Sequence, residues 1–470
     1  MDIILINPPW TFRKQNIWKD ISSCIPPIGL AQIASYLEKH AYKAVIWDMA
    51  AESLDSNALK KKIIELPCLP SFIGITSTTS IFHNAVEVAG IIRNIIPEVP
   101  IIMGGVHPTL LTDEVMKHSC VDYCIRGEGE QTLLELISGN NKMNISGLSF
   151  KKDNVIIHNP DRPFIENIDA LPLPAYHLLP MHKYHPALGS YQRLPGIGMI
   201  TTRGCPGRCT FCNGQYMGKR IRFNSANKIL NEIKILQKDY NIKEISFYDD
   251  TFTAVKNNVL ELCKLIIAEN IDITWSCFSR VDFVDKDILK LMKKAGCHQI
   301  CYGVESRDET ILKNMNKKIS FESVSCAIKM TKEAGIETRT TFMLGSPGET
   351  EQSMLQTINY ACELNPDIAL FNITTPYPGT EMFSWASENN LIKTRDWSCY
   401  DLSQPVMEVP GLSAAIIMKY YRKAYLRFYV RFSYIITQFI KTRNWKRLVI
   451  CLKVLYILFG MILNRKHEKK

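Results

Sequence analysis

The amino-acid sequence predicts an α/β protein in which two regions of alternating strands and helices precede a helical C-terminal region. Five short apolar runs separated by helical stretches occupy residues 1–140, and six further strand–helix repeats occupy residues 196–390. Buried strands that alternate with helices form parallel sheets, because each helix carries the chain back to the start of the next strand. We therefore expect a doubly wound parallel sheet first and a partial barrel of six βα units second. Residues 141–195 are the predicted linker, and residues 391–470 are the predicted helical region.

Continuous apolar runs predict the strands of the first region, since strands buried on both faces lack a polar side. The predicted strands are Ile3–Asn7, Ala44–Asp48, Phe72–Thr76, Ile101–Met103 and Tyr123–Ile125. Helices are predicted at Pro26–Leu37 and near 57–66, 82–95 and 129–138. In the linker, Gly147–Phe150 and Val155–His158 flank a polar turn and indicate a β-hairpin.

The second region repeats the same rhythm six times. Its predicted strands are Met199–Thr202, Glu244–Tyr248, Thr274–Ser279, Gln299–Val304, Thr338–Leu344 and Ile368–Ile373. Predicted helices follow near 225–239, 255–268, 285–294, 308–314, 321–334 and 350–363. Active sites of such barrels lie at the C-terminal ends of the strands, so we look there for functional residues.

Residues suited to ligand contact follow four of the five strands of the first region. Paired glycines let a backbone approach a bulky ligand, and small hydroxyl side chains donate hydrogen bonds without filling space. Ligands of doubly wound sheets bind beyond the carboxyl ends of the strands. Turn chemistry alone explains any one of these loops, but four loops on one edge favour a ligand site. The candidate residues are Asn7, Thr76, Ser77, Gly104, Gly105, Val106, His107, Gly127 and Glu128.

Three cysteines, Cys205, Cys209 and Cys212, follow the first predicted barrel strand and a glycine turn. Thiolates this close in sequence can surround one metal centre from a single loop. Three cysteines leave one iron of a 4Fe–4S cluster without a protein ligand, and an open iron can take a substrate or cofactor. The alternatives are a zinc loop whose fourth ligand lies elsewhere, or three unrelated cysteines.

The triplet resembles the cluster loop of the radical SAM enzymes, with Phe211 in the aromatic place before the last cysteine. In that family the open iron of a 4Fe–4S cluster is chelated by S-adenosylmethionine, and one electron then releases a 5′-deoxyadenosyl radical. The resemblance implies contacts to S-adenosylmethionine from the strand ends. For Asp250 a helix cap, and for Arg280 an ordinary salt bridge, are the competing interpretations. The candidate contacts are Phe211, Asp249, Asp250, Ser279, Arg280, Glu305 and Gly345.

Residues 1–140 resemble the cobalamin-binding domain that precedes the barrel in many radical SAM enzymes. The stretches Gly104-Gly105-Val106-His107-Pro108 and Arg126-Gly127-Glu128-Gly129-Glu130 carry this resemblance. No Asp-x-His-x-x-Gly follows the first strand, so the histidine that binds cobalt from below in methionine-synthase-like domains has no counterpart here. The lower axial ligand stays open, and His107 is either a cobalamin contact or a histidine held in the turn.

The two resemblances together imply a cobalamin-dependent radical SAM enzyme, and we expect a C-methyltransferase that acts on an unactivated carbon. In that family the deoxyadenosyl radical removes hydrogen from the substrate, and methylcobalamin then supplies the methyl group. A cyclisation, rearrangement or oxidation with the same cofactors is the nearest alternative, and a non-catalytic cobalamin or iron–sulfur sensor is another. The family implies a one-electron reductase of the flavodoxin or ferredoxin type as a partner. Which residues are catalytic stays open.

Net charge is distributed unevenly along the 470 residues. The chain carries a net charge of +10, yet residues 421–470 contain 13 Lys or Arg and one acidic residue, Glu468. With 15 cysteines and no basic leader before the first apolar run, the sequence predicts reduced thiols in the cytoplasm. The basic, aromatic tail predicts either contact with the inner face of a membrane or packing on the barrel. Its apolar run Leu448–Leu463 is short for a span, nucleic-acid binding is not expected, and the substrate is a small molecule or lipid-like.

Overall fold

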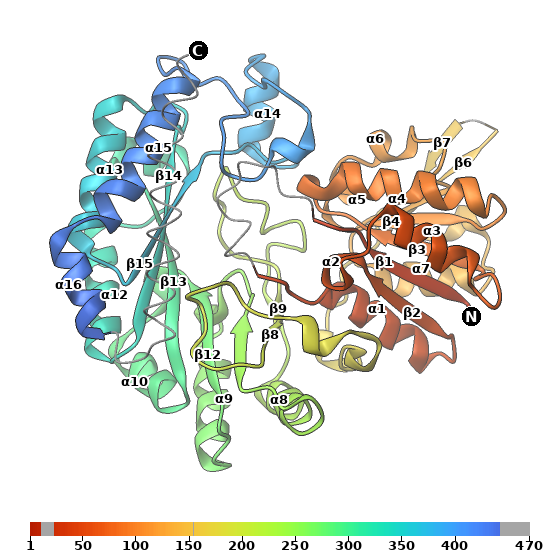
Figure 1. Ribbon diagram of the computed structural model, residues 1–470, viewed down its shortest axis with the longest axis horizontal. Helices are drawn as coiled ribbons and strands as arrows, with labels where there is room; N and C mark the ends of the chain where they lie inside the picture. The colour runs from red at the N-terminus through yellow and green to blue at the C-terminus, as the bar shows by residue number, and fades with distance from the viewer. Residues whose placement is uncertain (11–22, 154, 442–470) are drawn as a thin grey trace.

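The computed structural model describes residues 1–10, 23–153 and 155–441, which form two α/β lobes lying side by side (Figure 1). The first lobe contains a seven-stranded sheet in the order β2-β1-β3-β4-β5-β6-β7. Its first five strands pair in parallel, which confirms the predicted doubly wound sheet. These strands are β1 (Ile3–Asn7), β2 (Ala44–Asp48), β3 (Phe72–Thr76), β4 (Ile101–Gly104) and β5 (Tyr123–Ile125).

Helices cover both faces of this sheet. They are α1 (Ile28–Lys39), α2 (Met49–Glu52), α3 (Ser56–Ile64), α4 (Phe82–Ile95), α5 (Val106–Leu110), α6 (Thr112–Met116) and α7 (Gly129–Ile137). Successive residues of β1 point to opposite faces. Ile3 and Leu5 join the core formed with α1 and α7, whereas Ile4 and Ile6 join the core formed with α3 and α4. Both faces of the strand are therefore buried, as its continuous apolar run predicts.

The strand order reverses direction between β1 and β3. The chain runs from β1 outward to β2, and then returns to place β3 on the other side of β1. In a sheet of this order the two loops leaving the carboxyl ends of β1 and β3 diverge to opposite faces, which opens a crevice between them. The predicted ligand residues after β1 and β3 thus flank the expected binding position of the fold.

The hairpin of the predicted linker belongs to the first sheet. Strands β6 (Leu148–Lys152) and β7 (Val155–His158) pair antiparallel to each other, and β6 pairs with β5. The sheet therefore extends beyond the predicted boundary at residue 140. Without the hairpin, β5 would present an open edge of unpaired backbone groups, which folded proteins generally cover.

The second lobe contains six parallel strands in the order β15-β14-β13-β12-β11-β8. The strands are β8 (Gly196–Met199), β11 (Glu244–Phe247), β12 (Thr274–Ser279), β13 (Cys297–Glu305), β14 (Glu337–Leu344) and β15 (Ile368–Ile373). Helices α8 (Ala226–Tyr240), α9 (Lys256–Ala268), α10 (Lys286–Lys294), α11 (Glu309–Asn314), α12 (Phe321–Glu333) and α13 (Glu351–Leu364) connect them. Five of these helices begin at a side chain that accepts a backbone N–H, namely Ser225, Asp285, Asp308, Ser320 and Thr350.

The first barrel strand begins three residues earlier than the sequence predicts. β8 is Gly196–Met199 rather than Met199–Thr202, because two glycines hide its strand pattern. A Cβ on Gly198 would lie 2.8 Å from the ring of Tyr248, so only glycine leaves room for that ring. Thr202–Arg203 forms the separate strand β9, which pairs antiparallel with β10 (Arg222–Phe223) and closes the loop between them.

After the last barrel strand come α14 (Glu381–Glu388), which precedes the predicted C-terminal region, and α15 (Ala414–Tyr429) and α16 (Phe432–Lys441), which belong to it. α15 packs along the outer strand β15, where the hydroxyls of Tyr425 and Tyr429 bond the backbone of Phe371 and Ala369. For this helix the structure favours packing on the barrel. The apolar run Leu448–Leu463 lies outside the described residues.

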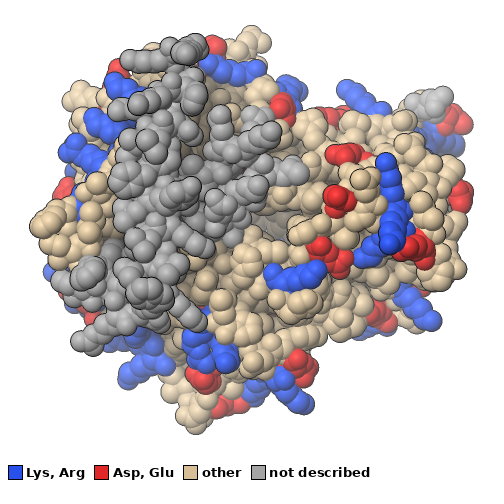
Figure 2. Space-filling view, in the orientation of Figure 1, with Lys and Arg blue, Asp and Glu red and all other residues tan. Residues whose placement is uncertain are grey.

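Surface charge is mixed in sign over the described part of the face shown in Figure 2, where Lys and Arg alternate with Asp and Glu. This agrees with the near-neutral balance of residues 1–420 in the sequence. Among the described helices, none has both the length and the apolar character that crossing a bilayer requires.

Candidate functional site

One cavity of about 360 Å³ lies between the ligand edge of the first sheet and the base of the cysteine loop. The first lobe contributes the loops after β3, β4 and β5, and the second lobe contributes the segment between β8 and the cysteine loop together with the end of β11. Predicted site residues from both resemblances therefore line a single space. Those in its wall are Thr76, Ser77, Gly104, Gly105, Val106, Gly127, Glu128, Asp249 and Asp250.

The glycine pair after β4 packs tightly against the loop after β3. Gly105 has φ +101°, and a Cβ there would lie 2.8 Å from the carbonyl oxygen of Ser77 and 2.9 Å from Oγ1 of Thr76. No other residue fits this position, because the clash is with backbone and the dihedral is left-handed. The Ser77 N–H donates to the Gly104 carbonyl at 2.9 Å, which holds the two loops in register.

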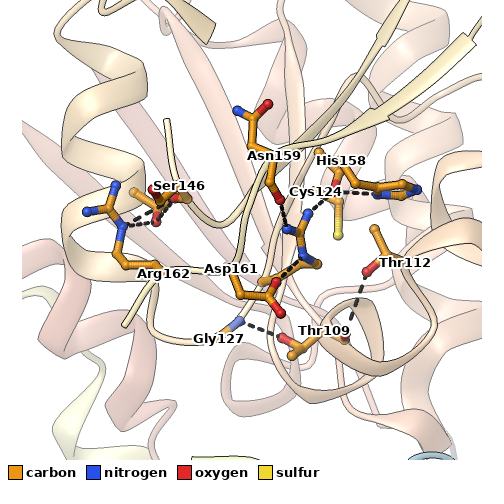
Figure 3. A network of polar contacts seen from close by, with 12 residues as sticks. Thr109, Thr112, Cys124, Gly127, Ser146, His158, Asn159, Asp161 and Arg162 are labelled. Carbon is orange, nitrogen blue, oxygen red and sulfur yellow. Dashed lines mark hydrogen bonds and ion pairs between the residues drawn. The ribbon is translucent and has the colours of Figure 1, made fainter. Parts of the chain in front are cut away.

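Thr109 of α5 joins the two glycine-containing loops of the edge (Figure 3). Its hydroxyl donates to the Gly105 carbonyl at 2.7 Å and accepts the Gly127 N–H at 3.0 Å. Arg126 donates to Asp161 at 3.0 Å and to the carbonyl of Asn159, the residue that follows β7. The edge is therefore built as one connected wall before any ligand arrives.

Two predicted cobalamin residues do not line this cavity. His107 is fully buried, with its ring stacked on Phe82 at 4.1 Å and edge-on to Trp397 at 5.4 Å. Burial lowers the pKa of His107 to about 3, so the ring is neutral. This is the arrangement of a histidine held in the turn. Asn7 donates to the Asp48 carboxylate at 2.8 Å at the end of β1.

Two of the three thiols of the cysteine loop lie beside Gly207, and the third contacts Gly214. A Cβ on Gly207 would lie 3.4 Å from the Sγ of Cys205 and 4.0 Å from the Sγ of Cys209, while the Sγ of Cys212 accepts the Gly214 N–H at 3.4 Å. Among the described residues, no three His, Cys, Asp or Glu side chains are grouped as ligands of a single metal ion. Three thiols from one loop form a donor set that fits an iron–sulfur cluster.

Two cations lie beside the thiols. Lys317 forms a buried ion pair with Glu305 at 2.8 Å, and its ammonium is 5.9 Å from the centre of the Phe211 ring. Burial alone would lower the pKa of Lys317, but the Glu305 carboxylate and the Cys209 thiol raise it above its usual value. Burial raises the pKa of Cys209, with Lys317 and Arg280 acting in the opposite direction. Positive charge at this position favours bound thiolates and an anionic ligand.

Glu305 turns inward through an unusual backbone. It has φ +68°, and the pairing of β13 with β14 shifts register between Gly303 and Glu305. A Cβ on Gly303 would collide with the Glu305 carboxylate and with the Lys317 ammonium, which shows that both side chains lie over this glycine. Thr341 also donates to Glu305 at 3.3 Å. A left-handed non-glycine residue at a strand end is costly and typical of a functional position.

Arg280 lies at the end of β12 with its guanidinium already engaged. It forms a bidentate ion pair with Asp282 at 2.9 Å and donates to the Lys317 carbonyl at 3.1 Å. Ser279, beside it, shares a buried hydrogen bond with Thr253. These contacts of Arg280 match the salt-bridge interpretation.

The remaining predicted contacts, Asp249, Asp250 and Gly345, lie in different surroundings. Asp249 is buried and accepts hydrogen bonds at 2.6–3.0 Å from the backbone and hydroxyl groups of Thr201 and Thr202. Burial raises its pKa to about 6, against the lowering effect of these bonds. Asp250 is exposed, and its Oδ2 lies 3.2 Å from where a Cβ on Gly214 would be. The Cα face of Gly345 is covered by Ile417 of α15.

Sequence reasoning missed Lys317, Thr109 and Arg203. All three act through contacts that are distant in sequence, so neither periodicity nor a motif marked them. Arg203 directly precedes the loop glycine and contacts Glu128 and Glu130 of the first lobe. The one sequence signal for Lys317 was the pair Lys317-Lys318, which follows the predicted helix near 308–314.

Comparison with known proteins agrees with the geometry. Residues 199–361 match the family model of the Radical SAM superfamily, and residues 17–137 match that of the B12 binding domain. The chain is 38% identical to an uncharacterized methyltransferase of Pyrococcus horikoshii, over 92% of this chain and 93% of that protein. It is 25% identical to the anaerobic magnesium-protoporphyrin IX monomethyl ester cyclase of Rubrivivax gelatinosus, over 92% of this chain and 79% of the cyclase.

The fold is also similar to that of a solved enzyme. The radical S-adenosylmethionine methyltransferase TsrM from Kitasatospora setae, solved with cobalamin and a [4Fe-4S] cluster bound, superposes with a TM-score of 0.69 at 16% identity. The match covers 92% of this chain and 89% of that chain. The chain therefore belongs to the radical SAM superfamily as an enzyme with a B12 binding domain, and the cofactors of that family are a 4Fe–4S cluster, S-adenosylmethionine and cobalamin.

Proposed function

We propose that this enzyme is a methyltransferase that adds a methyl group to an unactivated carbon of its substrate. The observation that carries the proposal is the single cavity whose wall contains both the glycine loops of the first sheet and the base of the cysteine loop. Two cofactors on these walls would face one substrate. The methyltransferase of Pyrococcus horikoshii, similar over nearly its whole length, supports transfer of a methyl group.

Each cofactor has a set of residues that would hold it. Cys205, Cys209 and Cys212 would bind the cluster. We add Lys317 to the residues that would contact S-adenosylmethionine. The others, implied by the family resemblance, are Phe211, Asp249, Asp250, Ser279, Arg280, Glu305 and Gly345. The loops with Thr76, Ser77, Gly104, Gly105, Val106 and Gly127 would face cobalamin. When bound, cluster and S-adenosylmethionine supply radical initiation, and cobalamin supplies the methyl group.

The residues of the chain contribute position and electrostatics. The ammonium of Lys317 is held by Glu305 at 2.8 Å, so it presents a fixed positive charge beside the thiols and would attract a carboxylate. Thr201 and Thr202 fix Asp249 and thereby the segment that leads into the cysteine loop. The wall formed by Gly105, Ser77 and Thr109 is rigid before binding, which reduces the ordering cost of a large ligand.

A cyclisation, rearrangement or oxidation with the same cofactors is the second candidate. The cyclase of Rubrivivax gelatinosus supports it, because the similarity covers 92% of this chain and 79% of the cyclase. The two proposals differ in the fate of the methyl group of S-adenosylmethionine. A methyltransferase places that group in the product, whereas a cyclase does not.

Isotope labelling separates the two candidates even while the substrate is unidentified. Anaerobically reconstituted enzyme is incubated with S-adenosylmethionine labelled in its methyl group, a reductant and a small-molecule extract, and the products are analysed by mass spectrometry. We expect a labelled product, with S-adenosylhomocysteine and 5′-deoxyadenosine both released. Release of 5′-deoxyadenosine with a new but unlabelled product would refute methyl transfer. The Cys209→Ala enzyme is the control for background labelling.

For its partners and location we propose a small-molecule or lipid-like substrate, a flavodoxin- or ferredoxin-type reductase, and a cytoplasmic enzyme that contacts the inner face of the membrane. Membrane contact is supported by α16, where Phe432 is 80% exposed and Ile435 and Ile436 are also exposed beside a basic sequence. Flotation with vesicles containing anionic lipid tests this. Enzyme truncated after Val430 should stay unbound, and equal binding by the truncated enzyme would contradict the proposal.

A further inference from the structure

The cysteine loop is closed at its base by a two-stranded ladder in which two arginines stand opposite each other. Arg203 of β9 pairs with Arg222 of β10, one on each side of the loop of residues 204–221. Directly opposed residues of an antiparallel pair project to the same face, and like charges there repel. Both side chains are largely buried, with 16% and 9% exposure, so water screens this repulsion weakly.

A carboxylate from the other lobe lies between the two arginines. Oε1 of Glu128 is 2.5 Å from Nη1 of Arg203 and 2.8 Å from Nη1 of Arg222. Glu130, two residues further on in the first turn of α7, binds the other terminal nitrogen of Arg203 at 2.6 Å. The side chains of Glu128 and Glu130 are only 2% and 4% exposed. Two buried cations are thus matched by two buried anions, all four hydrogen-bonded, which is the condition for a stable buried ion network.

The network also reaches into the linker and the loop itself. Oε2 of Glu128 accepts the Ile165 N–H at 2.6 Å and a second bond from Arg222 at 2.8 Å. Arg222 in turn donates to the carbonyl of Met217, inside the cysteine loop, at 2.6 Å. Both oxygens of Glu128 are therefore occupied by protein donors, which leaves little capacity for a ligand although the residue lines the cavity.

We propose that Glu128, assisted by Glu130, is a positioning residue for the iron–sulfur cluster rather than a contact to cobalamin. It neutralises the facing arginines and so keeps the cysteine loop closed around its cluster. The first lobe, which belongs to the cobalamin side, is thereby part of what retains the cluster. This inference rests on the proposed cluster position at Cys205, Cys209 and Cys212.

Release of iron from reconstituted enzyme to a strong chelator tests the inference without any turnover. We compare Glu128→Gln with Glu135→Gln, which removes a carboxylate from an ion pair with Arg162 elsewhere in the same lobe. Glu128→Gln should lose iron about tenfold faster than the parent, the factor that corresponds to one charge-assisted hydrogen bond. Glu135→Gln should stay within about twofold of the parent. Equal rates in Glu128→Gln and the parent would overturn the proposal.

A double variant distinguishes charge balance from general damage. In Glu128→Gln/Arg222→Gln the facing like charges are gone, so iron release should be slower than in Glu128→Gln alone. Damage without charge specificity would make the double variant release iron at least as fast, which would also overturn the proposal. If Glu128→Gln does not fold, Glu130→Gln carries the same test, with faster release as support and parental release as refutation.

Cobalamin binding provides the second readout. Titration followed by absorbance should give Glu128→Gln a cobalamin affinity within about threefold of the parent, because its carboxylate faces arginines. A large loss of cobalamin affinity with unchanged iron release would assign Glu128 to cobalamin and overturn the proposal. Failure of the proposed cluster site has a different signature, since the parent enzyme itself would then assemble no cluster, and failure of methyl transfer would appear only in the labelling experiment.

Discussion

Tyr425 of α15 supplies a backbone partner to the outer strand of the barrel, and its replacement by phenylalanine tests how much that contact contributes. The Tyr425 hydroxyl accepts the Phe371 N–H at 3.1 Å and donates to the Phe371 carbonyl at 2.9 Å. Phe371 is fully buried and Tyr425 is 4% exposed, so water has little access to either group. β15 pairs with β14 alone among the described strands, and without the tyrosine its outer edge would keep unpaired groups.

The expected cost follows from the two groups left without a partner. A buried backbone donor or acceptor that loses its hydrogen bond costs about 1–3 kcal/mol. Tyr425→Phe removes both partners of Phe371 while keeping the ring, so we expect a loss of about 2–4 kcal/mol in the free energy of unfolding. Tyr429→Phe removes both hydrogen bonds to the Ala369 backbone in the same way. Tyr429 is only half-buried, so water can form some of the lost hydrogen bonds and the expected loss of stability is smaller.

Urea unfolding followed by tryptophan fluorescence measures the change, and hydrogen exchange read by mass spectrometry locates it. Peptides covering residues 368–373 should exchange faster in Tyr425→Phe. The control is Tyr42→Phe, which loses an exposed hydrogen bond to Ser138 in the other lobe and should change stability by less than about 0.5 kcal/mol. Parental stability and parental exchange in Tyr425→Phe would refute the idea that α15 completes the barrel.

Three further predictions concern buried charge and backbone. Burial raises the pKa of Glu232 from 4.5 to about 7, so the charged carboxylate destabilises the fold increasingly as pH rises through this range. Glu232→Gln should therefore add about 3 kcal/mol to the free energy of unfolding at pH 8 and almost none at pH 4. An equal gain at both pH values would contradict this. Lys317→Met should lower the free energy of unfolding by about 3–5 kcal/mol, because it leaves Glu305 buried without its partner. The double variant Lys317→Met/Glu305→Gln should lose less in the same urea assay. Additive losses from the two single variants would argue against a coupled pair. Gly105→Ala should weaken cobalamin binding by at least about tenfold in an absorbance titration, because its Cβ would lie 2.8 Å from a backbone oxygen, while unchanged affinity would remove this loop from the site.

Strands were predicted well wherever the chain is continuously apolar. β1, β2, β3, β5, β12 and β15 have the predicted bounds. β8 was misplaced because Gly196 and Gly198 carry no hydrophobic signal, and they are glycine to make room for neighbours in the folded chain. The hairpin was predicted, but its place in the first sheet depends on β5 needing a partner, which local sequence does not encode.

The predicted site was incomplete for a related reason. Motifs marked the cysteines and the glycine loops, because their chemistry resides in consecutive residues. Lys317, Thr109 and Arg203 act across the fold, on partners that only the tertiary structure brings near. Glu128 shows the reverse case, since its motif suggested a ligand contact whereas the structure places both of its oxygens on arginines and a backbone amide.

The central claim is that the thiols of Cys205, Cys209 and Cys212 hold a 4Fe–4S cluster whose fourth iron is open to S-adenosylmethionine. Electron paramagnetic resonance of the reduced, anaerobically reconstituted enzyme tests this directly when spectra are taken with and without S-adenosylmethionine. We predict iron and sulfide matching one full cluster per chain, and a spectrum that changes when S-adenosylmethionine is added. A spectrum indifferent to S-adenosylmethionine, or bound zinc in place of iron and sulfide, would contradict the account.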